Sequence, residues 1–147
     1  MSHELLVELL FEDFSESELQ ELLSISEPKK FLSGDFLFKE GDNSDSIYII
    51  FSGRVEISTQ KKDHDKISFP TVVNGTVLGE IAFFDGKPRT ASVRAIDNLQ
   101  AIIISKSSFD ELEKNHTKLA IKLLKDILRV TAERLRWADK KLIDLSI

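Results

Sequence analysis

Residues 79–93 read GEIAFFDGKPRTASV. It begins with a glycine and one carboxylate, Glu80, followed by four apolar residues. After an Asp85-Gly86 turn it has one arginine, Arg89, and then small residues that end at Val93. An acid and a base that stand nine positions apart in an apolar segment either pair with each other or each require a different partner.

The chemistry of the stretch favours two different partners. The guanidinium of Arg89 can hold a phosphate through two parallel hydrogen bonds. Residues 80–84 are enough for one helical turn, whose free N–H groups at Ile81 and Ala82 would attract the same anion. An ionised Glu80 repels an anion and only accepts hydrogen bonds, so it needs a donor such as a ribose hydroxyl. We therefore expect a ligand with an anion at one end and a hydroxyl group close to it.

The composition is that of one globular domain covering residues 1–147. Apolar residues make up 41% and charged residues 31% of the chain. The net charge of −5 argues against nucleic-acid binding over the whole surface. The absence of cysteine excludes disulfides, thiolate catalysis and cysteine-ligated metal sites.

Three regions follow one another along the chain. Residues 1–28 have helical spacing of leucines, with Ser15 and Glu18 forming a capping box and Pro28 closing the second helix. Residues 30–105 are short runs of β-branched and aromatic residues separated by glycine turns, which predicts eight short strands in an antiparallel β-roll or jelly-roll barrel. Residues 106–147 are helical again, with Ser107 or Ser108 as an N-cap and a long helix over 117–145.

The stretch resembles the phosphate-binding cassette of the cyclic nucleotide-binding domain family. The pattern G-E-x-A-x(3)-G-x-P-R-T-A-S-V is in register at residues 79–93. Residues 31–58, FLSGDFLFKEGDNSDSIYIIFSGRVEIS, are similar to the first strands of that family, and the helical flanks also fit. The resemblance implies a mainly β fold with flanking helices, a short helix in the cassette and a long C-terminal helix.

The resemblance also implies roles for individual residues. Glu80 would bind the ribose 2′-hydroxyl, and Arg89 would bind the exocyclic oxygens of the cyclic phosphate. The remaining candidate ligand-binding residues are Gly79, Ile81, Ala82, Thr90 and Ala91. The expected ligand is cyclic AMP (cAMP), with cyclic GMP as the alternative, because the family has threonine at the place of Thr90 in members of both specificities. No separate cofactor is implied.

In members of this family, a residue of the last helix often covers the purine base. The candidates for this role here are Arg129, Arg134 and Trp137. An aromatic ring can stack on the base, although Trp137 could equally pack only against the fold. The same helix carries apolar or small residues at alternating spacings of three and four, which is a heptad seam. Its members are Leu124, Leu128, Thr131, Leu135, Ala138, Leu142 and Leu145. We therefore expect a homodimer through this helix and an effector protein whose identity the sequence does not give.

Other functions have less support in the residues. The histidines lack metal-ligand spacing, and no second catalytic group accompanies Glu80, so we expect neither a metal site nor enzyme activity. No signal peptide or membrane span is evident, which indicates a cytoplasmic protein. The chain ends at Ile147, soon after the long helix, so we expect no direct contact with nucleic acid. Two alternatives stay open: a ligand-independent interaction domain that keeps the fold, and DNA binding through a partner.

Overall fold

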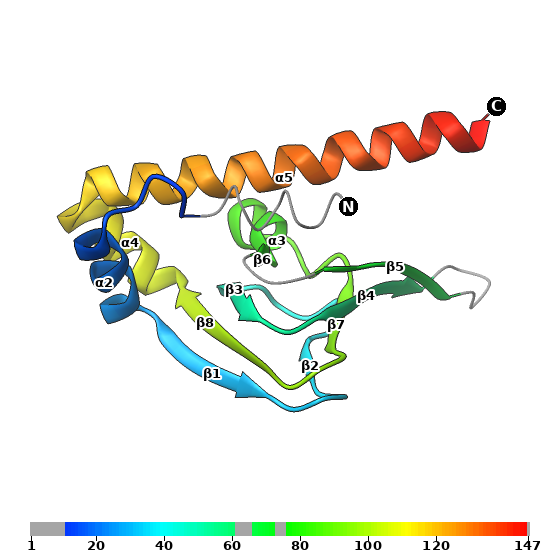
Figure 1. Cartoon of the computed structure of the whole chain (residues 1–147), viewed down its shortest axis with the longest axis horizontal. Helices are drawn as coiled ribbons and strands as arrows, with labels where there is room; N and C mark the ends of the chain where they lie inside the picture. Colours follow the sequence, from blue (N-terminus) through cyan, green and yellow to red (C-terminus); the bar gives the residue numbers. More distant parts are fainter. Residues whose placement is uncertain (1–10, 61–65, 73–75, 147) are drawn as a thin grey trace.

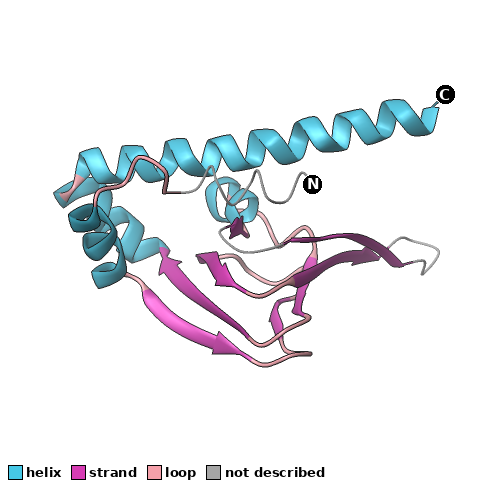
Figure 2. Ribbon diagram, viewed as in Figure 1, coloured by secondary structure: helices cyan, strands magenta, loops and turns pink. Residues whose placement is uncertain are grey.

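The computed structural model describes residues 11–60, 66–72 and 76–146, with the side chains of 66–72 and of 141–146 left aside. Helices cover one side of the molecule and strands form the other (Figure 1, Figure 2). No helix in the described residues is both long and apolar enough to cross a membrane.

Eight antiparallel strands form two sheets of four within the described residues. The first sheet has the order β1-β8-β3-β6 and the second has the order β2-β7-β4-β5. The strands are β1 (Glu27–Phe31), β2 (Phe36–Phe38), β3 (Ser46–Ser52), β4 (Val55–Gln60), β5 (Lys66–Val72), β6 (Thr76–Leu78), β7 (Ser92–Ala95) and β8 (Leu99–Ser105). The prediction of eight antiparallel strands is therefore confirmed.

The prediction of a closed barrel is wrong, because no ladder among the described strands joins the two sheets. Two of the four edge strands, β2 and β6, contain only three residues each. Strands this short offer too few backbone groups to continue a ladder from one sheet into the other. The molecule therefore has two open sheets that face each other.

Alternation along the strands produces two cores. On β3, Ile47 and Ile49 face the helices, while Ile50 belongs to the cluster between the sheets. The cluster under the helices also contains Leu112 of α4 and Leu123 of α5, both fully buried. Because successive strand residues point to opposite faces, one sheet can pack against the other sheet and against the helices at the same time.

The helices are α2 (Glu16–Ile25), α3 (Glu80–Asp85), α4 (Lys106–Asn115) and α5 (Thr117–Ser146). The capping box of Ser15 and Glu18 at the start of α2 is confirmed. The helix expected before Phe11 lies outside the described residues. Helix α5 runs along the top of the molecule, and α3 lies between it and the sheets (Figure 1).

Two predicted helix boundaries were wrong. Helix α2 ends at Ile25, and Pro28 lies inside β1. Strand β1 is an edge strand, where a proline without an N–H group is tolerated. The N-cap of α4 is Ser105, whose hydroxyl accepts a hydrogen bond from the Ser108 N–H, rather than Ser107 or Ser108. The N-cap is therefore also the last residue of β8.

Candidate functional site

Arg89 is a buried cation held by backbone carbonyl groups. Its side chain donates from Nη1 to the Gly79 carbonyl and from Nη2 to the Ser46 carbonyl, at 2.9 Å in both cases. The residue is only 4% exposed, and its Nε has no hydrogen-bond partner among the described residues. Burial lowers the pKa of Arg89 from its ordinary value. The group nevertheless stays protonated in a protein, so the charge is buried.

The turns on both sides of Arg89 fix its position. Its backbone N–H donates to the Asp42 carbonyl at 2.8 Å, and its own carbonyl accepts from the Gly41 N–H at 2.9 Å. The guanidinium carbon lies 4.2 Å from the centroid of the Phe38 ring and 5.7 Å from that of the Tyr48 ring. These aromatic faces attract the cation without adding an anionic partner.

Glu80 opens helix α3 and faces α5. It is 4% exposed, and its Oε1 lies 2.9 Å and its Oε2 3.2 Å from Nη1 of Arg134. The hydroxyl of Thr131 lies 3.4 Å from the same Oε2. As the sequence predicted, Glu80 and Arg89 do not pair with each other.

Helix α3 is bounded by two glycines with left-handed backbone, Gly79 at φ 79° and Gly86 at φ 72°. A Cβ atom at Gly79 would stand 2.3 Å from Nη1 of Arg89, so no other residue fits there without moving the guanidinium. The first-turn N–H groups of Ile81 and Ala82 have no acceptor earlier in the helix. Helix α3 therefore begins with N–H groups that have no acceptor within the helix, on the same short segment that carries Glu80.

The other predicted site residues lie at different depths. Ala82 is buried and Ile81 is exposed on α3. Thr90 is exposed and Ala91 is half-buried in the bend that precedes β7. Arg89 itself lies in the loop before β7.

The three candidate caps of α5 are in different surroundings. Arg134 reaches the cassette, where its Nη2 also donates to Thr76 Oγ1 at 2.6 Å and to the Val77 carbonyl. Nη1 of Arg129 lies 2.5 Å from Oδ1 of Asp126, a residue of the same helix. Trp137 is half-buried and follows Arg134 by three positions on α5.

A family model described as the cyclic nucleotide-binding domain matches residues 28–116, which is more than half of the chain. The chain belongs to the cyclic nucleotide-binding domain family.

Among its relatives, the CRP-like cAMP-activated global transcriptional regulator of Mycobacterium tuberculosis is 28% identical over 136 residues, which cover 92% of this chain and 59% of that protein. The cAMP-dependent protein kinase regulatory subunit of Emericella nidulans is 34% identical over 83 residues, covering 56% of this chain and 19% of the subunit. The chain thus spans about three fifths of the first relative and a smaller part of the second. A solved cyclic nucleotide-binding domain of Methylobacillus flagellatus superposes with a TM-score of 0.87 at 26% identity, covering 99% of this chain and 84% of that one.

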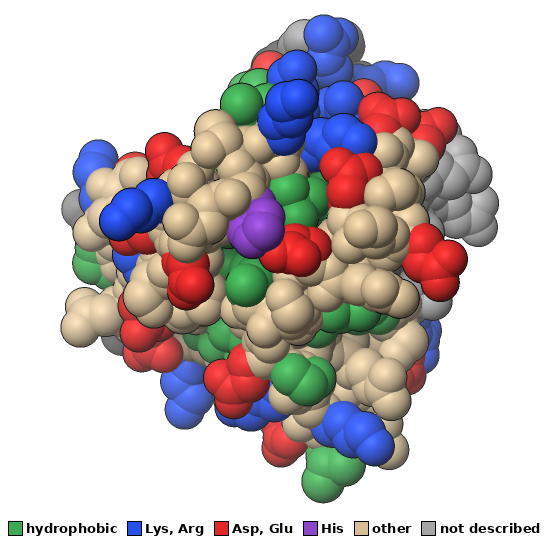
Figure 3. Space-filling view, turned by 90° about the vertical axis from the view of Figure 1, so that its left-hand side faces the viewer, with side chains coloured by type: hydrophobic (Ala, Val, Ile, Leu, Met, Phe, Trp, Pro, Cys, Tyr) green, Lys and Arg blue, Asp and Glu red, His purple; other side chains and the backbone are tan. Residues whose placement is uncertain are grey.

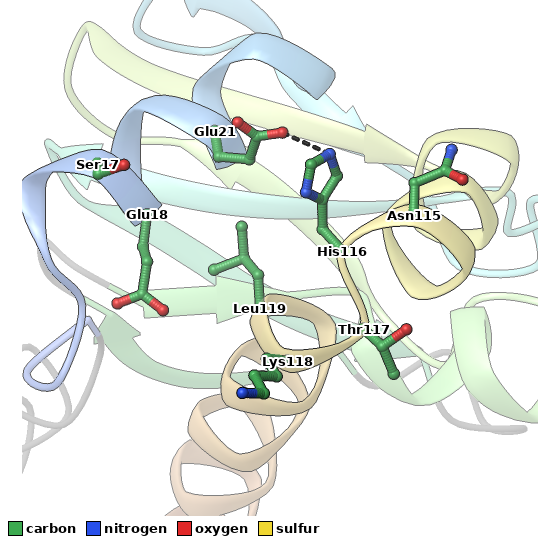
Figure 4. Close-up of a pocket in the computed structure, with 8 residues that line it drawn as sticks. All are labelled: Ser17, Glu18, Glu21, Asn115, His116, Thr117, Lys118 and Leu119. Carbon is green, nitrogen blue, oxygen red and sulfur yellow. Dashed lines mark ion pairs between the residues drawn. The ribbon is translucent and has the colours of Figure 1, made fainter.

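A further hollow lies at the start of α5. A cavity of about 440 Å³ is lined by residues of α2, of the end of α4 and of the start of α5 (Figure 4). Nε2 of His116 lies 2.6 Å from Oε1 of Glu21 across it. Figure 3 shows this face, where a histidine side chain (purple) lies at the surface beside acidic side chains (red), with lysine and arginine side chains (blue) gathered above. Neither Glu80 nor Arg89 lines this hollow, so it is separate from the cassette.

The described residues contain no group of three or more histidine, aspartate or glutamate side chains that could hold a metal ion. Three neighbours of the cassette could not be predicted from the sequence as such: Ser46, Thr76 and Thr131. Thr131 was noted only as a seam residue, and nothing in the local sequence links the other two to residues 79–93. Their contacts with Arg89, Arg134 and Glu80 arise from the fold.

Proposed function

We propose that this chain is a cyclic nucleotide sensor that binds its ligand, cAMP, between the cassette and helix α5. The observation that carries the proposal is the buried guanidinium of Arg89. It has two neutral carbonyl groups as acceptors and an unused Nε, and no carboxylate pairs with it among the described residues. Burial lowers the pKa of Arg89 and outweighs Asp42, Asp45 and Glu80, which act on its charge without direct contact. A buried cation without an acidic group in contact is unfavourable, and a bound phosphate would supply one.

Glu80 supports a ligand with a hydroxyl group near the anion. It lies on the same short helix whose first residues follow Gly79, the residue that Arg89 contacts. A cyclic phosphate carries one negative charge, which one arginine and the first-turn N–H groups can balance. The ribose 2′-hydroxyl would then donate to Glu80. Ile81, Ala82 and Ala91 would complete the phosphate cradle through their N–H groups.

The proposal of cAMP as the ligand rests on the descriptions of two relatives, both of which mention cAMP. The regulator of Mycobacterium tuberculosis is described as cAMP-activated and the subunit of Emericella nidulans as belonging to a cAMP-dependent kinase. Cyclic GMP is the alternative ligand, because Thr90 is exposed beside Arg89 and suits either purine. The base cap that we propose is Trp137, because an aromatic ring can stack on a purine and Trp137 follows Arg134 by three positions on α5.

We propose further that the signal passes through α5 to a dimer interface and to an effector protein in the cytoplasm. Thr131 and Arg134 join α5 to Glu80, so a ligand at Glu80 would change what α5 contacts. Two leucines of the predicted seam of α5 are open to solvent: Leu128 is 67% exposed and Leu135 is 62% exposed. Two such helices could cover each other's seams in a parallel coiled coil.

We expect no enzyme activity and no direct nucleic-acid contact from this chain.

Isothermal titration calorimetry of the whole chain tests the proposal, with cAMP, cyclic GMP and linear 5′-AMP as ligands. We expect saturable heat with a cyclic nucleotide, stronger for cAMP, and far weaker binding of 5′-AMP because its phosphate carries more charge and lacks the ring. If the folded chain gives no heat with either cyclic nucleotide, the alternative of a ligand-independent interaction domain replaces the proposal. In that case the melting temperature would also be the same with and without ligand.

A further inference from the structure

The guanidinium of Arg134 joins three elements at the cassette. Its Nη1 contacts both oxygens of Glu80, the first residue of α3. Its Nη2 contacts the hydroxyl of Thr76 and the carbonyl of Val77, the first two residues of β6. The contacts span 54 to 58 positions along the chain. One side chain of α5 therefore fixes where the carboxylate of Glu80 stands relative to the sheet.

Charge balance gives this contact a role when a ligand is present. Glu80 is 4% exposed, so its charge is buried whether or not a nucleotide is bound. A ribose hydroxyl is a neutral donor and cannot offset that charge. Arg89 and Arg134 carry two positive charges, and Glu80 with a cyclic phosphate would carry two negative ones. The occupied site is neutral only if Arg134 stays in place, which argues against its displacement by the ligand.

The carboxylate also has room for another donor. An ionised carboxylate offers about four lone-pair positions. Arg134 and Thr131 provide the three contacts to Glu80 that the structure records. One of these, from the Thr131 hydroxyl at 3.4 Å, is long. A ribose hydroxyl could therefore donate to Glu80 while Arg134 remains bound.

We propose that Arg134 is a positioning residue for ribose recognition, which holds the carboxylate of Glu80 in place and acts on the ligand only through it. This inference rests on the proposed function, and it separates Arg134 from the base-capping role considered for it above. The opposite arrangement, in which Arg134 occupies Glu80 until the ligand displaces it, predicts a different response to substitution. The two can be told apart with a ligand that lacks the 2′-hydroxyl.

The test compares cAMP with 2′-deoxy-cAMP by calorimetry in the parent chain, Arg134→Gln, Arg134→Lys and the control Arg136→Gln. Arg136 is exposed two positions further along α5. A hydrogen bond to a charged group predicts a preference for cAMP of about 10- to 150-fold in the parent and in Arg136→Gln. In Arg134→Gln this ratio should fall at least about fivefold, since Glu80 loses its charge partner and its fixed position. Arg134→Lys should be intermediate, because lysine keeps the charge without the planar fork that reaches both α3 and β6.

An unchanged ratio in Arg134→Gln, with both affinities reduced equally, would show a purely structural role and overturn the inference. A gain in cAMP affinity would show that Arg134 competes with the ligand, and would overturn it too. If Arg134→Gln does not fold, Arg134→Lys and Thr76→Val provide the test. Both variants should reduce the preference for cAMP over 2′-deoxy-cAMP, and an unchanged preference in either one refutes the inference. A parent chain that binds neither nucleotide contradicts the proposed function itself, whereas binding with an unchanged ratio contradicts only this inference.

Discussion

Single residues of the cassette show how backbone geometry and charge are linked. Gly79 lies in the left-handed region, and its missing Cβ leaves the space that the Arg89 guanidinium uses. Gly86 has a similar backbone conformation at the other end of α3, but a Cβ there would have no neighbour within 4 Å. The two glycines thus form a matched pair in which only one shapes the site.

We expect Gly86→Ala to lower the free energy of unfolding by about 1–2 kcal/mol, the cost of a left-handed alanine. Gly79→Ala should cost about 1.5–3 kcal/mol more, because it must also break a hydrogen bond of the buried Arg89 cation. Urea unfolding followed by circular dichroism measures both. Equal losses in the two variants would show that Arg89 does not depend on the space at Gly79.

Asp126 is a buried charge outside the cassette, on the opposite side of α5 from the seam. It is 1% exposed and accepts hydrogen bonds from the Phe11 N–H and from Arg129. Burial raises the pKa of Asp126 above its ordinary value, even though these partners act in the other direction. The native state therefore binds this proton more tightly than the unfolded chain does, and the ionised form weakens the native state.

The sign of the pH effect follows from this shift. As the pH rises through the ordinary pKa and then the raised native pKa, Asp126 ionises and the free energy of unfolding falls. Asp126→Asn removes the titration and can still accept the Phe11 N–H. We expect the stability of this variant relative to the parent to be greater at about pH 7 than at about pH 4, measured by urea unfolding. If the difference in free energy of unfolding between Asp126→Asn and the parent is the same at both pH values, or favours the variant more at the acidic pH, the raised pKa of Asp126 is contradicted.

At the scale of the elements, features with a local signal could be predicted from the sequence. The capping box of α2 and the long helix α5 depend on residues close in sequence. Features that depend on neighbouring strands could not be predicted in this way. Pro28 is a helix breaker by local rules, yet it is acceptable in β1 because that strand lies at a sheet edge. The closed barrel was wrong because the pairing of short edge strands cannot be deduced from alternation alone.

Helix α5 presents two exposed leucines of the predicted seam, Leu128 and Leu135, on which the proposed dimer depends. In the double variant Leu128→Gln with Leu135→Gln, each subunit loses two apolar contacts. Burying one leucine is worth about 1.5–3 kcal/mol, so we expect the dimer dissociation constant to rise at least about a hundredfold. Analytical ultracentrifugation over a concentration series measures it, with Lys125→Gln, an exposed residue of the same helix outside the predicted seam, as the control. A parent chain that is monomeric at all concentrations, or a double variant that dimerises equally well, would refute the interface.

On the scale of the whole molecule, the site combines one contiguous segment with contacts from distant ones. Residues 79–91 could be proposed as a site from the sequence because the cassette is continuous and its residue types suit a cyclic phosphate and a ribose. The partners of Arg89 and Glu80 could not, since Ser46 is 43 positions away from Arg89 and Arg134 is 54 positions away from Glu80. Such contacts depend on how the sheets and α5 pack, which no local pattern encodes. The fold therefore adds to the cassette a link to the helix that we propose transmits the signal.

The most direct test of the account is the affinity for cAMP of Arg89→Ala compared with Lys87→Ala, measured by calorimetry on folded protein. Lys87 is an exposed cation two positions away on the same loop. Because Arg89 would form two charge-assisted hydrogen bonds to the phosphate, we predict that Arg89→Ala weakens binding at least about a hundredfold. Lys87→Ala should change it by no more than about twofold, as is usual for a screened surface charge. Equal effects of the two substitutions, or undiminished binding in Arg89→Ala, would contradict the claim that Arg89 holds the phosphate.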